Sequence, residues 1–138
     1  MTKWCSSMKM KIHHIAIATK NIGKSCETYM RLGYSVGNIV DDIQRDVRIC
    51  FITLGHVRFE LVQPLSIASP VSKILEKTGH NSIYHVCYET DKINDSIEDL
   101  AKLGFMAISK MESAPAIDEK RVVFLFHKTL GLIELVEN

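Results

Sequence analysis

Two histidines and two glutamates offer a metal ion four ligand atoms from matching places in the sequence. His14 and His85 each lie in an early β-rich stretch, while Glu60 and Glu134 each lie in a later one with an apolar residue before them and Leu-Val after them. Burying an ionised carboxylate without a partner costs on the order of several kcal/mol, so such a residue is paired, neutralised or bound to a metal. Imidazole nitrogens and carboxylate oxygens suit a divalent ion. These four residues are therefore the candidate metal ligands.

Each of the four residues has an ordinary structural explanation when it is taken alone. A single histidine in a strand is more often a hydrogen-bonded core or surface group, and a single glutamate in an amphipathic strand usually faces solvent. The joint arrangement favours ligation, because the same two residue types recur at the same two places in both halves of the chain. A ligand set on a pseudo-twofold axis needs such a pattern.

An internal repeat relates the two halves of the sequence. Residues 12–19 (IHHIAIAT) match residues 83–90 (IYHVCYET) at an offset of 71 residues. Identical residues follow at the same offset: Ile22/Ile93, Ser25/Ser96, Glu27/Glu98, Leu32/Leu103 and Gly33/Gly104. Self-similarity at one fixed offset indicates two copies of one module. The histidine kept in both copies is where we expect the chemistry to lie.

The first copy, at about residues 11–63, predicts the order β-α-β-β-β. Alternation predicts a strand at residues 11–19, with His14 on one face and His13 on the other; Tyr84 should likewise point away from the face of His85. A helix should begin at the cap residue Asn21 and end at Gly33. Further strands are expected at residues 34–40, 47–54 and 57–62.

A connector at about residues 64–82 and a second module at about residues 83–137 complete the chain. Prolines and serines mark residues 63–70 as a loop, and a short helix at residues 71–77 should end at Gly79. The second module predicts a strand at residues 83–90, a helix at 94–103, strands at 105–108, 122–126 and 130–136, and an irregular loop at 113–118. The fold class is thus α+β, with two tandem βαβββ modules in one domain at residues 11–138. Residues 1–10 are expected to form a disordered or frayed tail.

The composition favours a small-molecule partner. The chain has 17 Lys and Arg against 16 Asp and Glu, a net charge of +1 and no long run of either sign, so neither a nucleic-acid nor a membrane footprint is visible. No apolar run approaches the ~18 residues that a membrane span needs. The cysteines are scattered and form no close pair, which favours free thiols in a reducing cytosol; they are Cys5, Cys26, Cys50 and Cys87. We therefore expect a cytoplasmic protein.

The paired modules resemble the glyoxalase superfamily, also called vicinal oxygen chelate proteins, over about residues 11–137. The similarity rests on the His-Ile-Ala-Ile-Ala stretch at residues 14–18 and on Glu-Leu in the fourth and last strands. Within the superfamily the chain is most similar to methylmalonyl-CoA epimerases, on residues 14–18, 60–65, 69–77, 85–89 and 133–135. The resemblance implies a curved mixed sheet whose two half-barrels form a cleft, and a homodimer. It also implies one divalent ion (Co, Ni, Zn, Mn or Fe), held by His14, Glu60, His85 and Glu134.

The resemblance further implies a reaction. Two imidazoles and two carboxylates leave two positions of an octahedral ion open for adjacent substrate oxygens, which stabilises an enediolate formed by removing a proton next to a carbonyl. Glu134 is the first candidate for the base, and Glu60 is the second. The expected function is a metal-dependent epimerase, isomerase or lyase acting on a small carbonyl or acyl-CoA compound, similar to methylmalonyl-CoA epimerase or lactoylglutathione lyase.

Two other classes of function remain open on this fold. A ring-cleaving dioxygenase or a resistance-type transferase would use two histidines and one carboxylate, and Glu60 as a second carboxylate argues against that version. A non-catalytic ligand-binding module would not need an intact set of four ligands. The chain also departs from the epimerase pattern: Tyr84 replaces a histidine, residues 116–121 replace a Gly-rich loop, and residues 48–51 carry no extra carboxylate.

Overall fold

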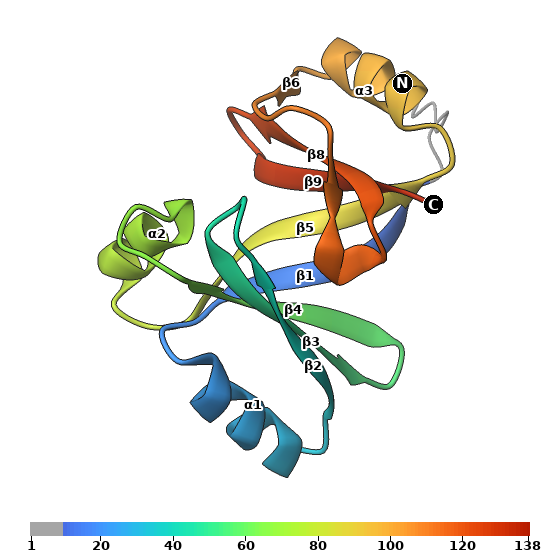
Figure 1. The fold of residues 1–138 in the computed structure, drawn as a ribbon. Coiled ribbons are helices and arrows are strands. Elements are labelled where there is room, and N and C mark those ends of the chain that lie inside the picture. The colour runs from blue at the N-terminus through green and yellow to red at the C-terminus, as the bar shows by residue number, and fades with distance from the viewer. Residues whose placement is uncertain (1–9) are drawn as a thin grey trace, which may run out of the picture.

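A computed structural model describes residues 10–138, which form one mixed sheet with helices outside it (Figure 1). The first half contains β1 (Lys11–Ala18), α1 (Ile22–Arg31), β2 (Ser35–Asp42), β3 (Val47–Leu54) and β4 (Val57–Pro64). Helix α2 (Pro70–Thr78) connects the halves. The second half contains β5 (Ser82–Thr90), α3 (Ile93–Lys102), β6 (Met106–Ala107), β7 (Glu112–Ala114), the 3-10 turn η1 (Pro115–Ile117), β8 (Lys120–His127) and β9 (Gly131–Glu137). The predicted α+β class is confirmed.

The two halves meet at the middle of the sheet. The strand order is β2-β3-β4-β1-β5-β9-β8-β6, with β7 paired to β8 beside this path. Strands β1 and β5 pair antiparallel with each other, while β4 and β9 pair parallel with β1 and β5 respectively. The histidine strands are therefore central neighbours, and each has a glutamate strand on its other side.

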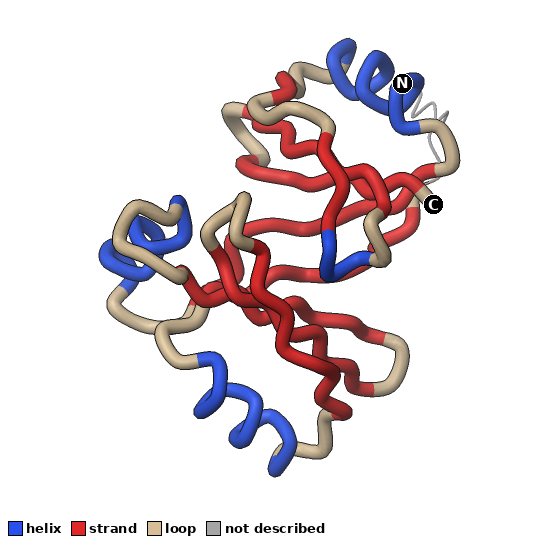
Figure 2. The backbone as a smooth tube through the Cα atoms, in the orientation of Figure 1, coloured by secondary structure: helices blue, strands red, loops and turns tan. Residues whose placement is uncertain are grey.

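Alternation along the strands divides their side chains between two faces. On β4, Leu61 packs with α1 on the outer face, while Val62 packs with α2 on the inner face. On β9, Leu135 packs with α3 on the outer face, while Val136 packs beside η1 on the inner face. Figure 2 shows α1 and α3 outside the strands of their own halves. The inner face, bordered by α2 and η1, carries the candidate site.

The outer helices begin at side chains from the last strand of their own half. The N–H of Ile22 donates to Oε1 of Gln63 over 2.7 Å, and the N–H of Ile93 donates to Oε2 of Glu137 over 3.2 Å. The predicted cap is confirmed as well, because Oδ1 of Asn21 accepts from the backbone N–H of the third helical residue at 3.0 Å. Both helices are thereby tied to the strands that carry the candidate glutamates.

The second half differs from the expectation in two places. The loop expected at residues 113–118 is partly regular, because β7 pairs with β8 and η1 follows it. The strand expected at residues 105–108 is reduced to two residues, Met106–Ala107. Of the expected tail, residues 1–9 lie outside the described residues, and Met10 packs against the core of the second half. None of the described helices combines the length and apolar character required to cross a bilayer.

Candidate metal centre

The four central strands bring all four candidate ligands together. Nε2 of His14 lies 3.2 Å from Oε1 of Glu134 and 3.4 Å from Oε1 of Glu60. Nε2 of His85 lies 3.2 Å from Oε1 of Glu134 and 3.9 Å from Oε1 of Glu60. Each residue is at most 5% exposed. The structure thus places two imidazoles and two carboxylates in one buried cluster, hereafter the tetrad.

A β-bulge lies next to each histidine of the tetrad. Along the ladder of β1 and β5, the register shifts at His13 on one strand and at Tyr84 on the other, so each is an extra residue without a partner. A bulge re-aims side chains next to a site, since it breaks strict alternation. The prediction that these residues point away from the ligands is therefore wrong. Nδ1 of His13 lies 2.8 Å from Nδ1 of His14, and the rings of Tyr84 and His85 pack edge to face at 4.5 Å.

Charge within the tetrad shifts the pKa of its members. Burial alone would lower the pKa of His14, but the nearby carboxylates of Glu60 and Glu134 outweigh it and raise the pKa to about 9. Burial would raise the pKa of Glu134, yet the imidazoles of His14 and His85 lower it to about 2. The pKa of His13 falls to about 4 because the ring is partly buried and lies near His14 and Arg58. Near neutral pH the metal-free tetrad therefore holds an ionised Glu134 and a protonated His14.

The geometry of the tetrad fits a divalent ion. Among the described residues, Nε2 of His14, Nε2 of His85 and Oε1 of Glu134 are buried without a hydrogen-bond partner. Ligand atoms at about 2.1 Å from one ion lie about 3 Å apart when they are adjacent. The four ligand atoms all lie within 4.8 Å of one another. Small side-chain shifts would let all four atoms bind one ion.

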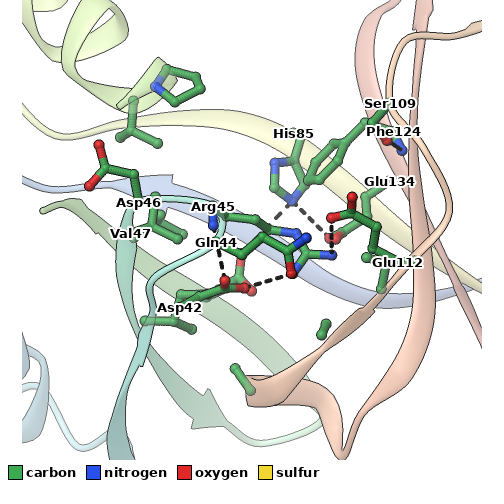
Figure 3. A pocket seen from close by; sticks show the side chains of 18 of the residues that line it. Asp42, Gln44, Arg45, Asp46, Val47, His85, Ser109, Glu112, Phe124 and Glu134 are labelled. Carbon is green, nitrogen blue, oxygen red and sulfur yellow. Dashed lines mark hydrogen bonds and ion pairs between the residues drawn. The ribbon is translucent and has the colours of Figure 1, made fainter. Parts of the chain in front are cut away.

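A cavity of about 530 Å³ opens beside the tetrad and is bordered by Glu60, His85 and Glu134. Apolar side chains form the walls near these residues, including Ile49, Val62, Val122 and Phe124. Polar side chains also line the cavity: Asp42, Gln44, Arg45, Asp46, Ser109 and Glu112. Figure 3 shows Asp42, Gln44 and Arg45 close together and Ser109 beside Phe124. A small organic ligand therefore meets both apolar and polar contacts in this cavity.

Arg45 joins the two halves across this cavity, and sequence reasoning missed it. Its Nη1 donates to Oδ2 of Asp42 over 2.7 Å and to the backbone carbonyl of Ser113 over 3.1 Å, while Nη2 lies 3.9 Å from Oε2 of Glu112 (Figure 3). Asp42 is only 2% exposed. Residues 41–46 look like an ordinary polar connection in the sequence, so nothing there signalled a partner in the second half.

The cysteines do not join the tetrad as ligands. Cys26, Cys50 and Cys87 are free and buried, while Cys5 lies outside the described residues. Cys87 pairs in register with Glu134, and burial together with that carboxylate raises the pKa of its thiol. The thiol therefore stays protonated and acts as a small apolar neighbour.

A family model and individual known proteins both match most of this chain. The family model described as the glyoxalase/bleomycin resistance protein/dioxygenase superfamily matches residues 13–124. The human mitochondrial methylmalonyl-CoA epimerase is 33% identical over 128 residues, which are 91% of this chain and 72% of that protein. An ethylmalonyl-CoA/methylmalonyl-CoA epimerase from Cereibacter sphaeroides is 32% identical over 91% of this chain and 96% of its own length.

Solved structures show the same fold. A hypothetical protein from Bacillus halodurans superposes with a TM-score of 0.82 at 28% identity, over 95% of this chain and 96% of that one. The methylmalonyl-CoA epimerase from Mycobacterium tuberculosis superposes with a TM-score of 0.79 at 22% identity, over 91% of this chain and 86% of that one. The predicted arrangement of paired modules is therefore shared with these proteins.

Proposed function

Since this chain belongs to the glyoxalase/bleomycin resistance protein/dioxygenase superfamily, we propose that it is a divalent-metal-dependent epimerase acting on an acyl-CoA compound such as methylmalonyl-CoA. The observation that carries the proposal is the buried tetrad beside a cavity of about 530 Å³. Relatives at 32–33% identity over 91% of this chain are named as methylmalonyl-CoA epimerases, which supports this substrate class.

The tetrad supplies the residues that this reaction needs. A divalent ion, when bound, would stabilise negative charge on a carbonyl oxygen of the substrate, so that the neighbouring C–H becomes more acidic. His14 and His85 would hold the ion from the central strands, where both side chains are buried. Glu134 borders the cavity and accepts the proton from the carbon next to the carbonyl. Loss of that proton leaves an enediolate.

Epimerisation also needs a proton returned to the other face of this planar carbon. Glu60 is the second candidate for this role, because it borders the cavity from β4 in the other half of the molecule. The β3 side chain at the cavity wall is Ile49, which carries no proton. The other carboxylates that line the cavity belong to Asp42, Asp46 and Glu112, of which Asp42 and Glu112 contact Arg45. The two glutamates of the tetrad are therefore the acid–base pair.

The two alternative classes are less well supported. An iron oxygenase site needs two histidines and one carboxylate, whereas Oε1 of Glu60 lies 3.4 Å from Nε2 of His14 and completes a set of four. A non-catalytic binding module gives no reason to bury two carboxylates beside two imidazoles. The named relatives also point to isomerisation.

The deciding experiment combines metal analysis with solvent exchange. Purified protein, reconstituted with Co²⁺, Ni²⁺, Zn²⁺, Mn²⁺ or Fe²⁺, should retain about one ion per chain, and a His85→Ala variant should retain almost none. In D₂O the loaded protein should exchange the C2 proton of methylmalonyl-CoA. Metal retention without exchange of this or simpler thioesters would contradict the epimerase assignment. Absence of bound metal after every reconstitution would contradict the metal site itself.

The oligomeric state and the cellular location are separate predictions. We propose a homodimer and a cytoplasmic location on the family resemblance and the cysteine pattern. Light scattering after gel filtration measures the mass of the particle, for which twice 15.6 kDa is expected. Fractionation of the producing cell tests the location.

A further inference from the structure

The hydroxyl group of Tyr84 has no hydrogen-bond partner among residues 10–138. It is the bulged residue next to His85, so its side chain lies on the same side of β5 as that ligand. Its ring packs against the inner-face cluster that contains Ala16 and Ile49, and it lines the cavity. No described residue forms a hydrogen bond with the hydroxyl. The phenol is therefore an unengaged donor at the cavity wall.

The equivalent residue of the first half is bonded differently. His13 occupies the matching bulge, 71 residues earlier, but its Nδ1 lies 2.8 Å from Nδ1 of His14 and its Nε2 lies 2.6 Å from Nη1 of Arg58. His13 does not line the cavity, whereas Tyr84 does. A β-bulge thus directs His13 toward neighbouring side chains in the first half and directs Tyr84 toward the cavity in the second half.

The hydroxyl of Tyr84 is a hydrogen-bond donor, as in any neutral phenol. The ring packs edge to face against His85 at 4.5 Å, so this donor belongs to a side chain that contacts the tetrad. A donor beside the tetrad is suited to an oxygen that gains negative charge during proton removal.

We propose that Tyr84 is a catalytic residue that donates a hydrogen bond to a substrate oxygen as negative charge develops on it. No bond of the tyrosine is broken: the O–H group stays intact, while the substrate C–H proton goes to Glu134. The inference rests on the proposed function for the substrate and adds a group outside the tetrad. It predicts that the hydroxyl contributes to turnover and to oxyanion binding but not to metal retention.

The first test measures oxyanion binding without turnover. Oxalate, a planar dianion with two adjacent oxygens, is titrated into the Co²⁺-loaded protein by calorimetry. Tyr84→Phe should weaken oxalate binding about tenfold, since one hydrogen bond to a charged group is lost, while the Kd for Co²⁺ should stay within about threefold. An unchanged oxalate Kd in Tyr84→Phe, or wild-type protein that binds no oxalate, would overturn the inference.

The matched control is Tyr88→Phe on the same strand. Tyr88 packs with the α3 cluster on the outer face and does not line the cavity. Its variant should bind both Co²⁺ and oxalate as the wild type does. Equal weakening in Tyr84→Phe and Tyr88→Phe would overturn the inference, because it would point to a general effect on the strand.

The second test separates this inference from the proposed function. Exchange of the C2 proton of methylmalonyl-CoA in D₂O should show kcat reduced about 100-fold in Tyr84→Phe, with KM little changed, as for removal of one oxyanion donor. Wild-type kcat in this variant would overturn the inference. Wild-type protein that exchanges no methylmalonyl-CoA proton, combined with Tyr84-dependent oxalate binding, would refute the substrate and support the donor role.

Discussion

Oε1 of Glu134 lies 3.2 Å from Nε2 of His14, so the last strand of the chain contacts the first strand at a buried pair. The pair connects the two modules, and both partners have shifted pKa values: about 9 for His14 and about 2 for Glu134. The same two atoms are candidate metal ligands. Stability, proton binding and metal binding are therefore coupled at this contact.

The stability of the metal-free protein should depend on pH through this pair. The pKa of His14 in the folded state, about 9, exceeds its unfolded value of 6.5, so its stabilisation is fully present below pH 6.5 and is lost as the pH rises through 9. We expect the free energy of unfolding to fall by about 3 kcal/mol over that range. Urea unfolding at a series of pH values measures it. A His14→Gln variant should show a flat profile, and an equally flat wild-type profile would contradict the prediction.

Metal affinity should rise with pH over the same interval. Below pH 9 the ion must displace one proton from His14, whereas Glu134, with a pKa of about 2, is already ionised. The Kd for Co²⁺ should therefore fall about tenfold per pH unit between pH 6.5 and 8.5 and level off above 9. Competition with a chelator of known affinity measures this. A Kd that does not change with pH would show that no proton is released.

Glu134→Gln should abolish proton transfer by this side chain while it preserves the shape of the site. The amide keeps the size of the side chain and one ligand oxygen but cannot accept the proton, so solvent exchange should slow about 10²–10⁴-fold. Glu137→Gln is the matched control on the same strand, because Glu137 contacts Arg121 and the start of α3 instead of the tetrad. Its exchange rate should match that of the wild type. A Glu134→Gln variant with normal exchange would leave Glu60 as the base.

The Arg45 contact should stabilise the fold more than an exposed ion pair does. Arg45→Met removes the guanidinium from the buried carboxylate of Asp42 and leaves only the backbone N–H of residue 45 as a donor, and we expect a loss of about 3 kcal/mol in the free energy of unfolding. Arg48→Met is the control, because Arg48 pairs with the exposed Asp41 and should cost less than about 1 kcal/mol. Urea unfolding of both variants compares them. Equal losses would show that the buried contacts of Arg45 stabilise the fold no more than an exposed ion pair does.

The sequence was sufficient for most of the elements and for the four residues of the tetrad. Repetition at one offset pairs His14 with His85 and locates both strands, and the apolar frame around Glu60 and Glu134 identifies buried carboxylates. The strand periodicity and the apolar neighbours of each glutamate are local signals, because each extends over only a few residues. Together with the repeat, they were enough to predict which side chains meet.

Features that depend on contacts between distant strands could not be predicted. The bulges at His13 and Tyr84 arise from the pairing of β1 with β5, and strict alternation wrongly placed both side chains on the far face. Gln63 looks like a polar strand end, yet it accepts from the first N–H of α1. Strand β7 exists because β8 lies beside it. In the first two cases the determining partner is remote in the chain, whereas β7 and β8 pair across the short segment that contains η1.

The second half is three residues longer than the first between the tetrad histidine and the tetrad glutamate. The histidines are 71 residues apart, but Glu60 and Glu134, like Gln63 and Glu137, are 74 apart. The added length lies in the part of the second half that forms β7 and η1 and lines the cavity through Ala114, Ala116 and Ile117. A perfectly symmetric pocket would hold a substrate equally well in either of two opposite orientations. The added segment makes the cavity wall unequal in the two halves, so we expect a substrate to bind in one of these two orientations.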